Sequence, residues 1–576
     1  MKNKTITELL QILRQNGHQN LTSTAENLLG TVRLNQNAIQ VMEGLRDYGN
    51  YIYFGIQNQL KMRIKSKIFK KSTIEVSVNI DGLPLYRNSL QQCWPILMKV
   101  HCDEYICQPF VVGLFCDNSK PLNTEDFLHD FVEKAAQLTR DGFINQGTTY
   151  NFKIKAFICD TPARAFIKCI KSHNGFYACE RCIIRGVSVS SRRVYPNMDC
   201  ALRTHDTFIE KADENHHVLN KVSPLLAIPH FDIVRAVLLD NMHLLYCGVS
   251  KCLLFKWKSG NPLSRISVAK RYVLTEHLIA LKNYIPMEFQ RKVFDYENLS
   301  NWKATQFRFF LLYCGPLILK DVLSDDKYKH FLLLHTACRI MNSSELAVHM
   351  VEYTRTLLRN FVSLMPTLYG TDSQVINIHN LIHIADDVEY LKAPLSDYTA
   401  FPFENCLGKI KRLVRAPNRP LSQICRRLSE METVSDINIQ PHALLQKCEP
   451  TAQFVDYNQD YIEYKMVQMK GMKIRTVHPD NLVLLRNGYH LEIITIFSRE
   501  KQTPKNIRDL FITGFCIEND ENAFDYPCES RRIGIHKLGL HAEIPETFQM
   551  TEITAKCINL KIHGVRFSIT LLHLKE

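Results

Sequence analysis

Residues 74–95 read IEVSVNIDGLPLYRNSLQQCWP, and this stretch contains the pattern that decides the fold. Apolar and polar residues alternate from Ile74 to Ile80, which predicts a strand with one face in a core. Asp81 ends that strand, and Gly82 and Pro84 then turn the chain. Two interpretations stay open: Asp81 opens an ordinary Asp-Gly turn, or its carboxylate at the rim of a sheet is a metal-binding or catalytic acid.

The segments that follow suggest where that strand belongs. Further strands are predicted at Trp94–Val100, Pro109–Phe115 and Tyr150–Cys159, with one helix before the last of them and another after Asp160. Three strands, a helix, a fourth strand and a helix form the order expected of an RNase H-like fold. In that fold the first and fourth strands lie side by side, so Asp81 and Asp160 would face one another and share a divalent metal.

Composition limits the class of protein. The chain has 576 residues, enough for two to four domains, and a formal net charge of +13, which suits a polyanionic partner or simply a soluble protein. No apolar run is long enough to span a membrane, and the N-terminus lacks a signal-peptide core. The 19 cysteines are scattered, so we expect reduced thiols in a cytosolic or nuclear protein.

Changes of pattern divide the chain further. The basic run Lys61–Lys71 is either a solvated face or a phosphate contact. The predicted architecture is α/β plus α, with a mainly β C-terminal domain. Its parts are a helical N-terminal region (1–70), an RNase H-like core with a Cys/His cluster (71–230), a large all-helical insertion (231–395), a helix that completes the core (396–445) and the β-rich C-terminal domain (446–576).

Cysteine and histidine concentrate after the second acid. Cys179 and Cys182 have the spacing of a zinc knuckle, and a tetrahedral zinc site needs two more ligands. His173 and His216 are the candidates for these ligands, and His217 is a further neighbour. Spacing alone does not decide which of them completes the site.

Two other histidine patterns lie in the predicted helical segment. His379 and His383 are separated by four residues, a geometry that can bind metal, but without the glutamate of the zinc-protease motif they are interpreted as structural. Asp240 and His243 are separated by three and would share a helical face. Taken alone, His243 is interpreted as a satisfied, partly buried histidine.

The last informative segment is a predicted helix, Phe401–Arg415. Glu404, Gly408, Lys411 and Arg415 recur on one stripe of it, and apolar residues occupy the other face. An acid, a glycine that permits close approach and two cations suit metal and phosphate. The alternative is an amphipathic surface helix with a solvated Glu404.

Several of these blocks together resemble one family. The blocks are IDGLPLYRNSLQQCWPI, CDTPARAFIKCIKSHNGFYACERC, LDNMHLLYCGVSK, WKATQFRFFLLYCGP, YKHFLLLHTACRIM, NIHNLIHIADDV and FPFENCLGKIKRLVRAPNRPL. In the same order, they resemble the transposase-domain proteins of invertebrate mobile elements related to the CACTA superfamily. The resemblance covers about residues 70 to 425.

The resemblance implies a DDE enzyme that cleaves and transfers DNA strands with Mg²⁺ or Mn²⁺. Asp81 and Asp160 would be the first two acids, and Glu404 is our choice for the third. The cysteine pair would hold a structural zinc ion, and Asp240 and His243 would lie near the active site. The cations that would contact DNA are Lys409, Lys411, Arg412 and Arg415.

The resemblance also sets the expected partners and the competing functions. We expect binding to transposon ends and target DNA, a homo-oligomer on DNA, a nuclear location and no membrane. The alternative function is a domesticated or decayed descendant that binds DNA or protein without cutting. A third is an RNase H-like nuclease acting in repair or on RNA hybrids, which would not require the helical insertion or the Cys/His cluster.

Overall fold

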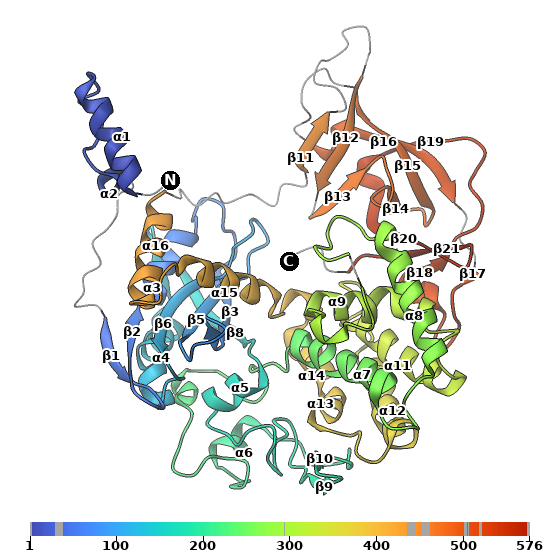
Figure 1. Ribbon diagram of the computed structural model, residues 1–576, viewed down its shortest axis with the longest axis horizontal. Helices are drawn as coiled ribbons and strands as arrows, with labels where there is room; N and C mark the ends of the chain where they lie inside the picture. Colours follow the sequence, from blue (N-terminus) through green and yellow to red (C-terminus); the bar gives the residue numbers. More distant parts are fainter. Residues whose placement is uncertain are drawn as a thin grey trace. The chain divides into compact units, whose positions relative to one another are not determined.

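The structure is a computed structural model that describes residues 3–28, 39–292, 294–434, 445–450, 461–469, 471–499, 504, 506–517 and 521–572 (Figure 1). The chain forms two compact units. Unit 1 comprises Met1–Ile170, His217–Val237 and Ala400–Pro441, and unit 2 comprises Lys171–His216, Leu238–Thr399 and His442–Glu576. The chain is mixed α/β, as predicted.

An eight-stranded sheet forms the centre of unit 1, in the order β1-β2-β6-β5-β3-β8-β7, with β4 paired to β5. Strand β5 is antiparallel to both β3 and β6, whereas β8 is parallel to β3. The strands are β1 (Gln40–Glu43), β2 (Tyr48–Tyr53), β3 (Thr73–Ile80), β4 (Leu83–Pro84), β5 (Gln92–Val100), β6 (Phe110–Asp117), β7 (Phe143–Asn145) and β8 (Thr148–Phe157). The four predicted strands correspond to β3, β5, β6 and β8.

Strand β3 is buried on both faces, whereas its alternating pattern predicts only one buried face. Ser77 and Asn79 are buried together with the apolar residues of the strand. Ser77 Oγ lies 2.6 Å from His101 Nε2, and Asn79 Nδ2 donates to the Ile158 carbonyl at 2.7 Å. These internal partners explain the difference, because a polar side chain can be buried at little cost when it is hydrogen-bonded.

Helices flank the sheet of unit 1. Helix α4 packs against β6 and β8, and Asn123 caps it by accepting a hydrogen bond from Glu125 N. The helices of this unit are α1 (Asn3–Gln15), α2 (Ala25–Leu28), α3 (Ile56–Arg63), α4 (Thr124–Asp141), α5 (Thr161–Ile167), the 3₁₀ turn η2 (Pro224–Ala227), α15 (Phe401–Leu413) and α16 (Pro420–Val434).

Two predictions of helix fail in unit 1. The N-terminal region 1–70 contains β1 and β2, because residues 48–53 pair with β6 and with the edge strand β1 and bury Tyr51 and Ile52. Residues 231–237 are also not helical: Phe157 N donates to the Ala236 carbonyl at 2.8 Å, as in a parallel strand pair. A short buried apolar run suits a strand as well as a helix. Parts of the predicted regions 1–70 and 396–445, residues 1–2, 29–38 and 435–444, lie outside the described residues.

Unit 2 is helical between residues 242 and 397. Helix α11 is its central element, because nearly every side chain from Tyr328 to Asn342 is buried. The elements are η3 (Met242–Ser250), α7 (Lys251–Ser259), α8 (Val268–Ala280), η4 (Leu281–Tyr284), η5 (Leu299–Asn301), α9 (Ala304–Phe309), η6 (Phe310–Cys314), α10 (Gly315–Ile318), α11 (Asp325–Asn342), α12 (Val351–Tyr369), α13 (Ile376–His379), α14 (Leu381–Leu391) and η7 (Leu395–Asp397), of which η3 and η6 are π-helical. Before them come a hairpin, β9 (Val187–Val189) and β10 (Arg192–Val194), and helix α6 (His205–Ile209).

The C-terminal part of unit 2 is β-rich, as the sequence predicts. Its sheet has the order β11-β12-β15-β14-β20-β21-β18-β17, with β13, β16 and β19 paired beside that path. The strands are β11 (Leu445–Pro450), β12 (Ile462–Met469), β13 (Met472–Arg475), β14 (Leu482–Leu485), β15 (His490–Ser498), β16 (Leu510–Ile517), β17 (Glu521–Asn522), β18 (Ile535–Lys537), β19 (Glu546–Gln549), β20 (Ile553–Ile562) and β21 (Val565–Thr570). Three short 3₁₀ turns join them, η8 (Ile507–Asp509), η9 (Ser530–Ile533) and η10 (Met550–Glu552).

The cysteines differ from expectation in one place. Cys93 and Cys116 are direct neighbours on β5 and β6 and form a disulfide, with Cα atoms 4.2 Å apart. The prediction of reduced thiols is therefore wrong for this pair, because the strand register that brings the two together is not visible in the sequence. The other cysteines are free thiols. In the described part of the chain, no helix has the length and apolar character needed to cross a membrane.

A buried arginine joins the helical and β-rich parts of unit 2. Arg339 of α11 is 1% exposed, and burial lowers the pKa of its guanidinium to about 10. It donates to the carbonyls of Leu312, Ile533 and Thr570 at 2.9, 2.8 and 3.2 Å. Because these acceptors come from both parts of the unit, a single side chain satisfies buried carbonyls on each side of the junction.

We expect Arg339→Met to destabilise unit 2 by about 3 kcal/mol or more, because the variant leaves two buried carbonyls and one partly buried carbonyl without this donor. Urea unfolding followed by tryptophan fluorescence measures the change. Lys329→Met, at an exposed position on the same helix, is the matched control and should change stability by less than about 0.5 kcal/mol. An Arg339→Met protein as stable as the control would contradict this account of the junction.

Candidate active site and metal centre

The first candidate site lies at the carboxyl end of strand β3 in unit 1. Asp81 follows β3 directly, and Asp160 follows the segment that continues β8. These segments are adjacent, because Asn79 bonds Ile158 and Ile80 N donates to Cys159 Sγ at 3.3 Å. The parallel pairing therefore places the two acids at the same edge of the sheet.

Helix α15 brings the third predicted acid to this edge. One carboxylate oxygen of Asp81 and one of Glu404 lie within 4.8 Å of each other, and both residues are partly exposed. Glu404 lies in the first turn of α15, whose Phe403, Leu407 and Ile410 are buried. The apolar face thus fixes the rotation of the helix and directs Glu404 towards Asp81.

The two aspartates also have local roles. Asp81 Oδ1 accepts a hydrogen bond from Gly82 N at 2.7 Å, so Asp81 does open an Asp-Gly turn as well as lying beside Glu404. Asp160 is the N-cap of α5, where its Oδ1 accepts from Ala163 N at 2.8 Å. Asp160 is not part of the Asp81–Glu404 group, although it ends the neighbouring strand segment.

The predicted DNA-contacting cations lie on or after α15. Lys409, Lys411 and Arg412 are exposed on the helix, and Arg415 is exposed just beyond its end. Lys411 Nζ donates to the Pro84 carbonyl at 2.5 Å, which ties the helix to the turn after Asp81. Gly408 lies on the same stripe, and a Cβ atom added there would meet no described heavy atom within 4 Å.

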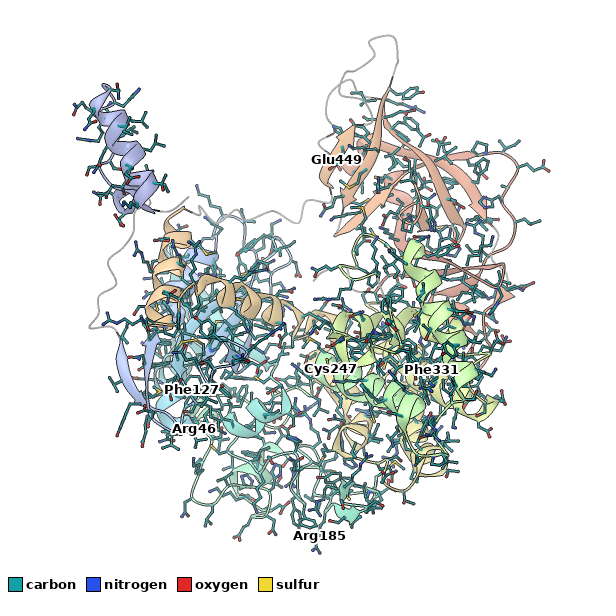
Figure 2. All side chains as sticks on the ribbon, viewed as in Figure 1. Arg46, Phe127, Arg185, Cys247, Phe331 and Glu449 are labelled. Carbon is teal, nitrogen blue, oxygen red and sulfur yellow. A yellow bond between two sulfur atoms is a disulfide. The ribbon has the colours of Figure 1, made fainter. Side chains whose placement is uncertain are left out.

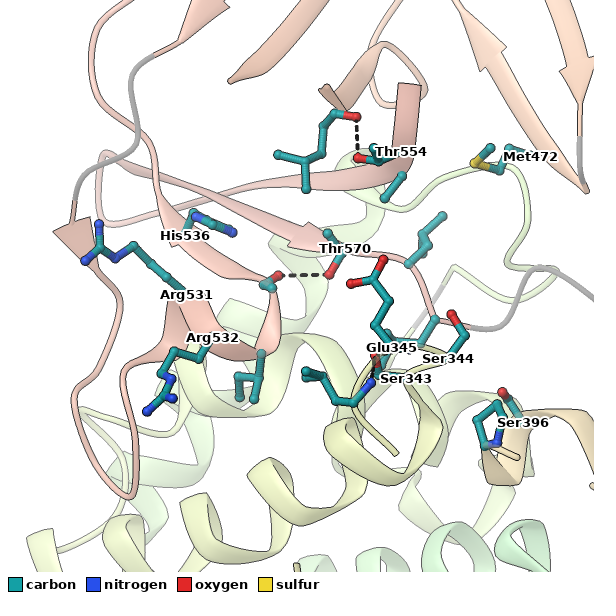
Figure 3. A pocket seen from close by; sticks show the side chains of 18 of the residues that line it. Ser343, Ser344, Glu345, Ser396, Met472, Arg531, Arg532, His536, Thr554 and Thr570 are labelled. Atoms are coloured by element: carbon teal, nitrogen blue, oxygen red, sulfur yellow. Dashed lines mark hydrogen bonds between the residues drawn. The ribbon is translucent and has the colours of Figure 1, made fainter. Parts of the chain in front are cut away.

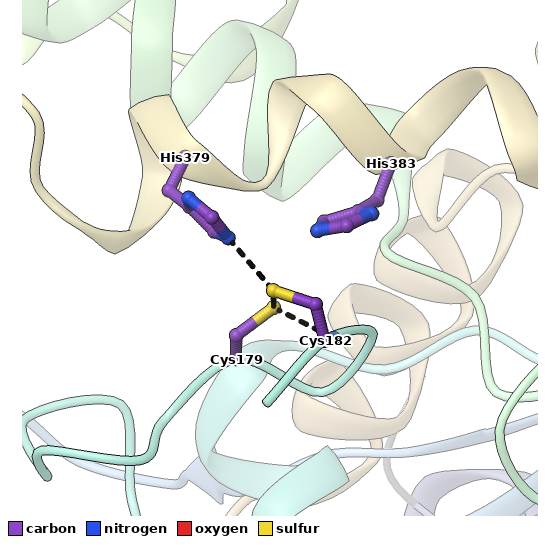
Figure 4. Close-up of side chains that lie close together, drawn as sticks. All are labelled: Cys179, Cys182, His379 and His383. Atoms are coloured by element: carbon purple, nitrogen blue, oxygen red, sulfur yellow. Dashed lines mark hydrogen bonds between the residues drawn. The ribbon is translucent and has the colours of Figure 1, made fainter. Parts of the chain in front are cut away.

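The second candidate site is a buried cluster in unit 2. Ligand atoms of Cys179, Cys182, His379 and His383 all lie within 4.8 Å of one another. The two sulfur atoms are 3.5 Å apart, and Cys182 Sγ is 3.3 Å from His379 Nε2. Figure 4 shows both histidine rings directed towards the two sulfurs.

These residues fit a tetrahedral zinc ion. Zinc bound at about 2.3 Å from sulfur and about 2.1 Å from nitrogen would separate its ligand atoms by about 3.5 to 3.8 Å. All four side chains are buried, and His383 Nε2 has no hydrogen-bond partner among the described residues. Backbone N–H groups of Arg181 and Cys182 approach Cys179 Sγ at 3.4 and 3.3 Å, as expected for a thiolate ligand.

The thiol of Cys179 is poised to ionise. Burial raises its pKa, but the hydrogen bond from Cys182 and the nearby histidines outweigh burial and hold the pKa well below the usual value, whereas the interaction with Cys179 and burial raise the pKa of Cys182. A thiolate is the form of cysteine that binds metal. The cluster therefore has the donor set and the geometry of a structural zinc site.

Two of the predicted zinc ligands are not in this cluster. His216 Nδ1 lies 2.7 Å from the Tyr177 carbonyl, and neither His216 nor His173 belongs to the group of four. The structure instead brings His379 and His383 to the cysteines, although the sequence favours a structural role for them. Their spacing of four residues is the signal that could have identified them. Sequence reasoning misses it because these histidines lie about 200 residues from the cysteines in the chain.

The Asp240–His243 pair also differs from prediction. Asp240 does not share a helical face with His243; it has a positive φ of 48° and precedes π-helix η3 (Met242–Ser250). Its Oδ2 lies 2.7 Å from His243 Nδ1 and accepts from His243 N at 3.1 Å. The pair therefore holds one imidazole in a fixed orientation at the start of η3, within unit 2.

Unit 2 also contains a cavity of about 520 Å³ between the end of α11 and the β-rich part (Figure 3). Its charged lining residues are Glu345, Asp397, Arg531 and Arg532, and His536 also lines it. Among the described residues, no group of three metal-binding side chains lies in this cavity. Its two acids are accompanied by two arginines, so its charge does not favour it as a site for metal cations.

Comparison with known proteins covers only the end of the chain. Residues 449–571, which form most of the β-rich part, match a family described as Domain of unknown function (DUF8592). No curated protein matches the chain.

We expect purified protein to contain about one zinc ion per chain, and expect His379→Asn and His383→Asn to lose it. Metal analysis after gel filtration, with thermal unfolding beside it, measures both the ion and its contribution to stability. His173→Asn and His216→Asn are the matched controls and should keep the metal. Loss of zinc in the controls but not in the first two variants would restore the ligand set predicted from the sequence.

Proposed function

We propose that this protein is a DDE-type DNA transposase, or a close derivative of one, that cleaves and joins DNA strands in a metal-dependent reaction. The observation that carries the proposal is the approach of Asp81 and Glu404, which are far apart in the sequence, within 4.8 Å. Their position beside Asp160 at one edge of a sheet supports it. The family resemblance of residues 70 to 425 supplies the reaction class.

The order of the strands supports an RNase H-like core. Three consecutive antiparallel strands, β3, β5 and β6, are followed by β8, which is parallel to β3 and lies on its other side. This is the arrangement that the sequence predicts for such a core, and it makes the ends of β3 and β8 neighbours. The helical segment of unit 2 would then be the insertion between the fourth strand and α15.

The acids fit hard divalent cations, which bind carboxylate oxygens. Asp81 and Glu404 would hold Mg²⁺ or Mn²⁺, and Asp160 would contribute the oxygen that does not cap α5. When bound, such ions activate a water or 3′-hydroxyl and stabilise the leaving oxygen. The protein positions the carboxylates: burial of one face of α15 fixes Glu404, and the turn at Gly82 fixes Asp81.

The exposed stripe of α15 would receive the DNA backbone. Lys409 and Arg412 are also exposed on α15 and add positive charge beside this stripe, and Gly408 leaves the helix surface open between Glu404 and Lys411. Cations contact phosphates without reading sequence, so this surface would position the strand against the acids. A homo-oligomer on DNA, a nuclear location and a structural zinc ion belong to the same proposal.

The test is cleavage of labelled duplex DNA with Mg²⁺ or Mn²⁺. We expect Asp81→Asn, Asp160→Asn and Glu404→Gln each to lower the rate by roughly 100-fold or more, the scale on which loss of one charge-stabilising group acts. Asn is itself a good N-cap, so Asp160→Asn should keep the stability of α5 while losing the charge. Thermal unfolding of each variant checks that the fold is intact.

The outcomes separate the candidate functions. Activity that survives Glu404→Gln would place the third acid elsewhere. A wild-type protein that binds DNA tightly but does not cleave it would favour the alternative, a domesticated or decayed descendant. Cleavage only of RNA–DNA hybrids would favour a nuclease.

Gly408 offers a separate test of the α15 surface. Gly408→Ala should stabilise the free protein by up to about 1 kcal/mol, because alanine is the better helix former and its Cβ meets nothing. Gly408→Leu should weaken DNA binding in a fluorescence anisotropy titration while leaving the fold intact, since its side chain would stand where the backbone approaches. Gln137→Leu, at an exposed position on α4, is the control, and equal DNA affinity for both leucine variants would contradict the proposed surface.

A further inference from the structure

The hairpin of β9 and β10 is strongly basic. Between Glu180 and Asp199 the sequence has no acidic residue, and the hairpin and the residues beside it contribute Arg185, Arg192 and Arg193. Its turn adds Ser190 and Ser191, and Ser188 lies on β9. Figure 1 shows the hairpin as a separate two-stranded ribbon, and in Figure 2 the Arg185 side chain lies at the outer edge of unit 2.

Two of the arginines are arranged around an exposed aromatic ring. The Arg193 guanidinium carbon lies 3.2 Å from the centroid of Phe176, and that of Arg185 lies 5.8 Å from it. Phe176 is 43% exposed, although a ring of this size is usually buried. Arg193 Nη1 also donates to Ser188 Oγ at 2.6 Å, so its guanidinium is held in place before any partner binds.

Local acids do not neutralise this pair. Arg192 forms an ion pair with Asp372 at 3.1 Å. Within the residues that the structure describes, neither Arg185 nor Arg193 is paired with a carboxylate. The hairpin therefore presents two uncompensated guanidinium groups on an aromatic support.

The hairpin is fixed to the Cys/His cluster. Gly186 N donates to the Phe176 carbonyl at 2.7 Å, and Tyr195, which follows β10, donates its hydroxyl to Gly175 O at 2.6 Å. Tyr195 N donates to Gln374 O at 2.8 Å, and its ring centroid lies 5.9 Å from that of His379. A metal ion in the Cys/His cluster would therefore also hold in place the hairpin that carries these arginines.

We infer that the β9–β10 hairpin is a second nucleic-acid contact, in which Arg185 and Arg193 bind the phosphate backbone of duplex DNA. The choice of DNA rests on the proposed function. A two-stranded ribbon fits the major groove of B-DNA, and arginine donates two parallel hydrogen bonds to phosphate. Serine hydroxyls at the turn would add phosphate contacts, which position the duplex without reading its sequence.

The test is a fluorescence anisotropy titration of a labelled duplex over a range of salt concentrations. For Arg185→Gln/Arg193→Gln, the slope of log K against log salt should fall by about 2, because each phosphate that no longer binds an arginine keeps about one counterion. The Arg185→Lys/Arg193→Lys protein keeps the charges and should keep the slope. Arg486→Gln/Arg508→Gln, two exposed sites in the β-rich part, removes the same net charge and should not change the slope.

Two further variants separate this inference from the proposed function. Asp81→Asn should lose cleavage and keep the wild-type slope, so a protein that never cleaves DNA can still show the hairpin contact. Retained zinc content in the glutamine variant shows that the cluster is intact. An unchanged slope in the glutamine variant would overturn the inference. So would a glutamine variant that binds DNA like the wild type but no longer binds a polyglutamate probe, because that result would indicate an acidic protein partner.

Discussion

The parallel pairing of β3 with β8 is the constraint on which the candidate active site depends. Each strand is followed by an aspartate, and hydrogen bonds from Asn79 and Ile80 to residues 158 and 159 hold the two ends in register. A shift of one residue would turn every side chain of β3 to the other face and remove the buried Ser77 and Asn79 from their partners, so these hydrogen bonds fix the register. The packing of β3 and β8 in the core therefore sets the positions of Asp81 and Asp160, and no other element is needed to bring these strand ends together.

The pattern of apolar and polar residues in a short stretch predicts single elements and their buried faces. The alternation from Ile74 to Ile80 predicts β3, and the stripe of α15 predicts which face is buried and that Glu404 is on the other. Local pattern does not predict the burial of Ser77 and Asn79, because their hydrogen-bond partners, His101 and Ile158, come from distant residues. Nor does it distinguish a strand from a helix at residues 231–237, where an apolar run fits both.

The ligands of the Cys/His cluster also could not be predicted from local pattern, because two of them come from a distant part of the chain. Cys179 and Cys182 are identified from their spacing, but the nearest histidines in the sequence are not the ones that meet them. The ligand pair comes from α13 and α14, about 200 residues away, and only the packing of unit 2 decides that. Nearness in sequence is a poor guide here, because the entropy cost of closing a loop grows slowly with its length.

Asp387 explains how this cluster can order more than its own ligands. One carboxylate oxygen accepts from Arg181, between the two cysteines, at 2.7 Å, and the other accepts from Leu239 N at 2.8 Å. Asp387 lies on α14, one turn beyond His383, and is 2% exposed, so both bonds act in a buried environment where they are strong. A metal ion that fixed α14 against the cysteine knuckle would therefore also fix Leu239, and with it the adjacent Asp240 that orients His243.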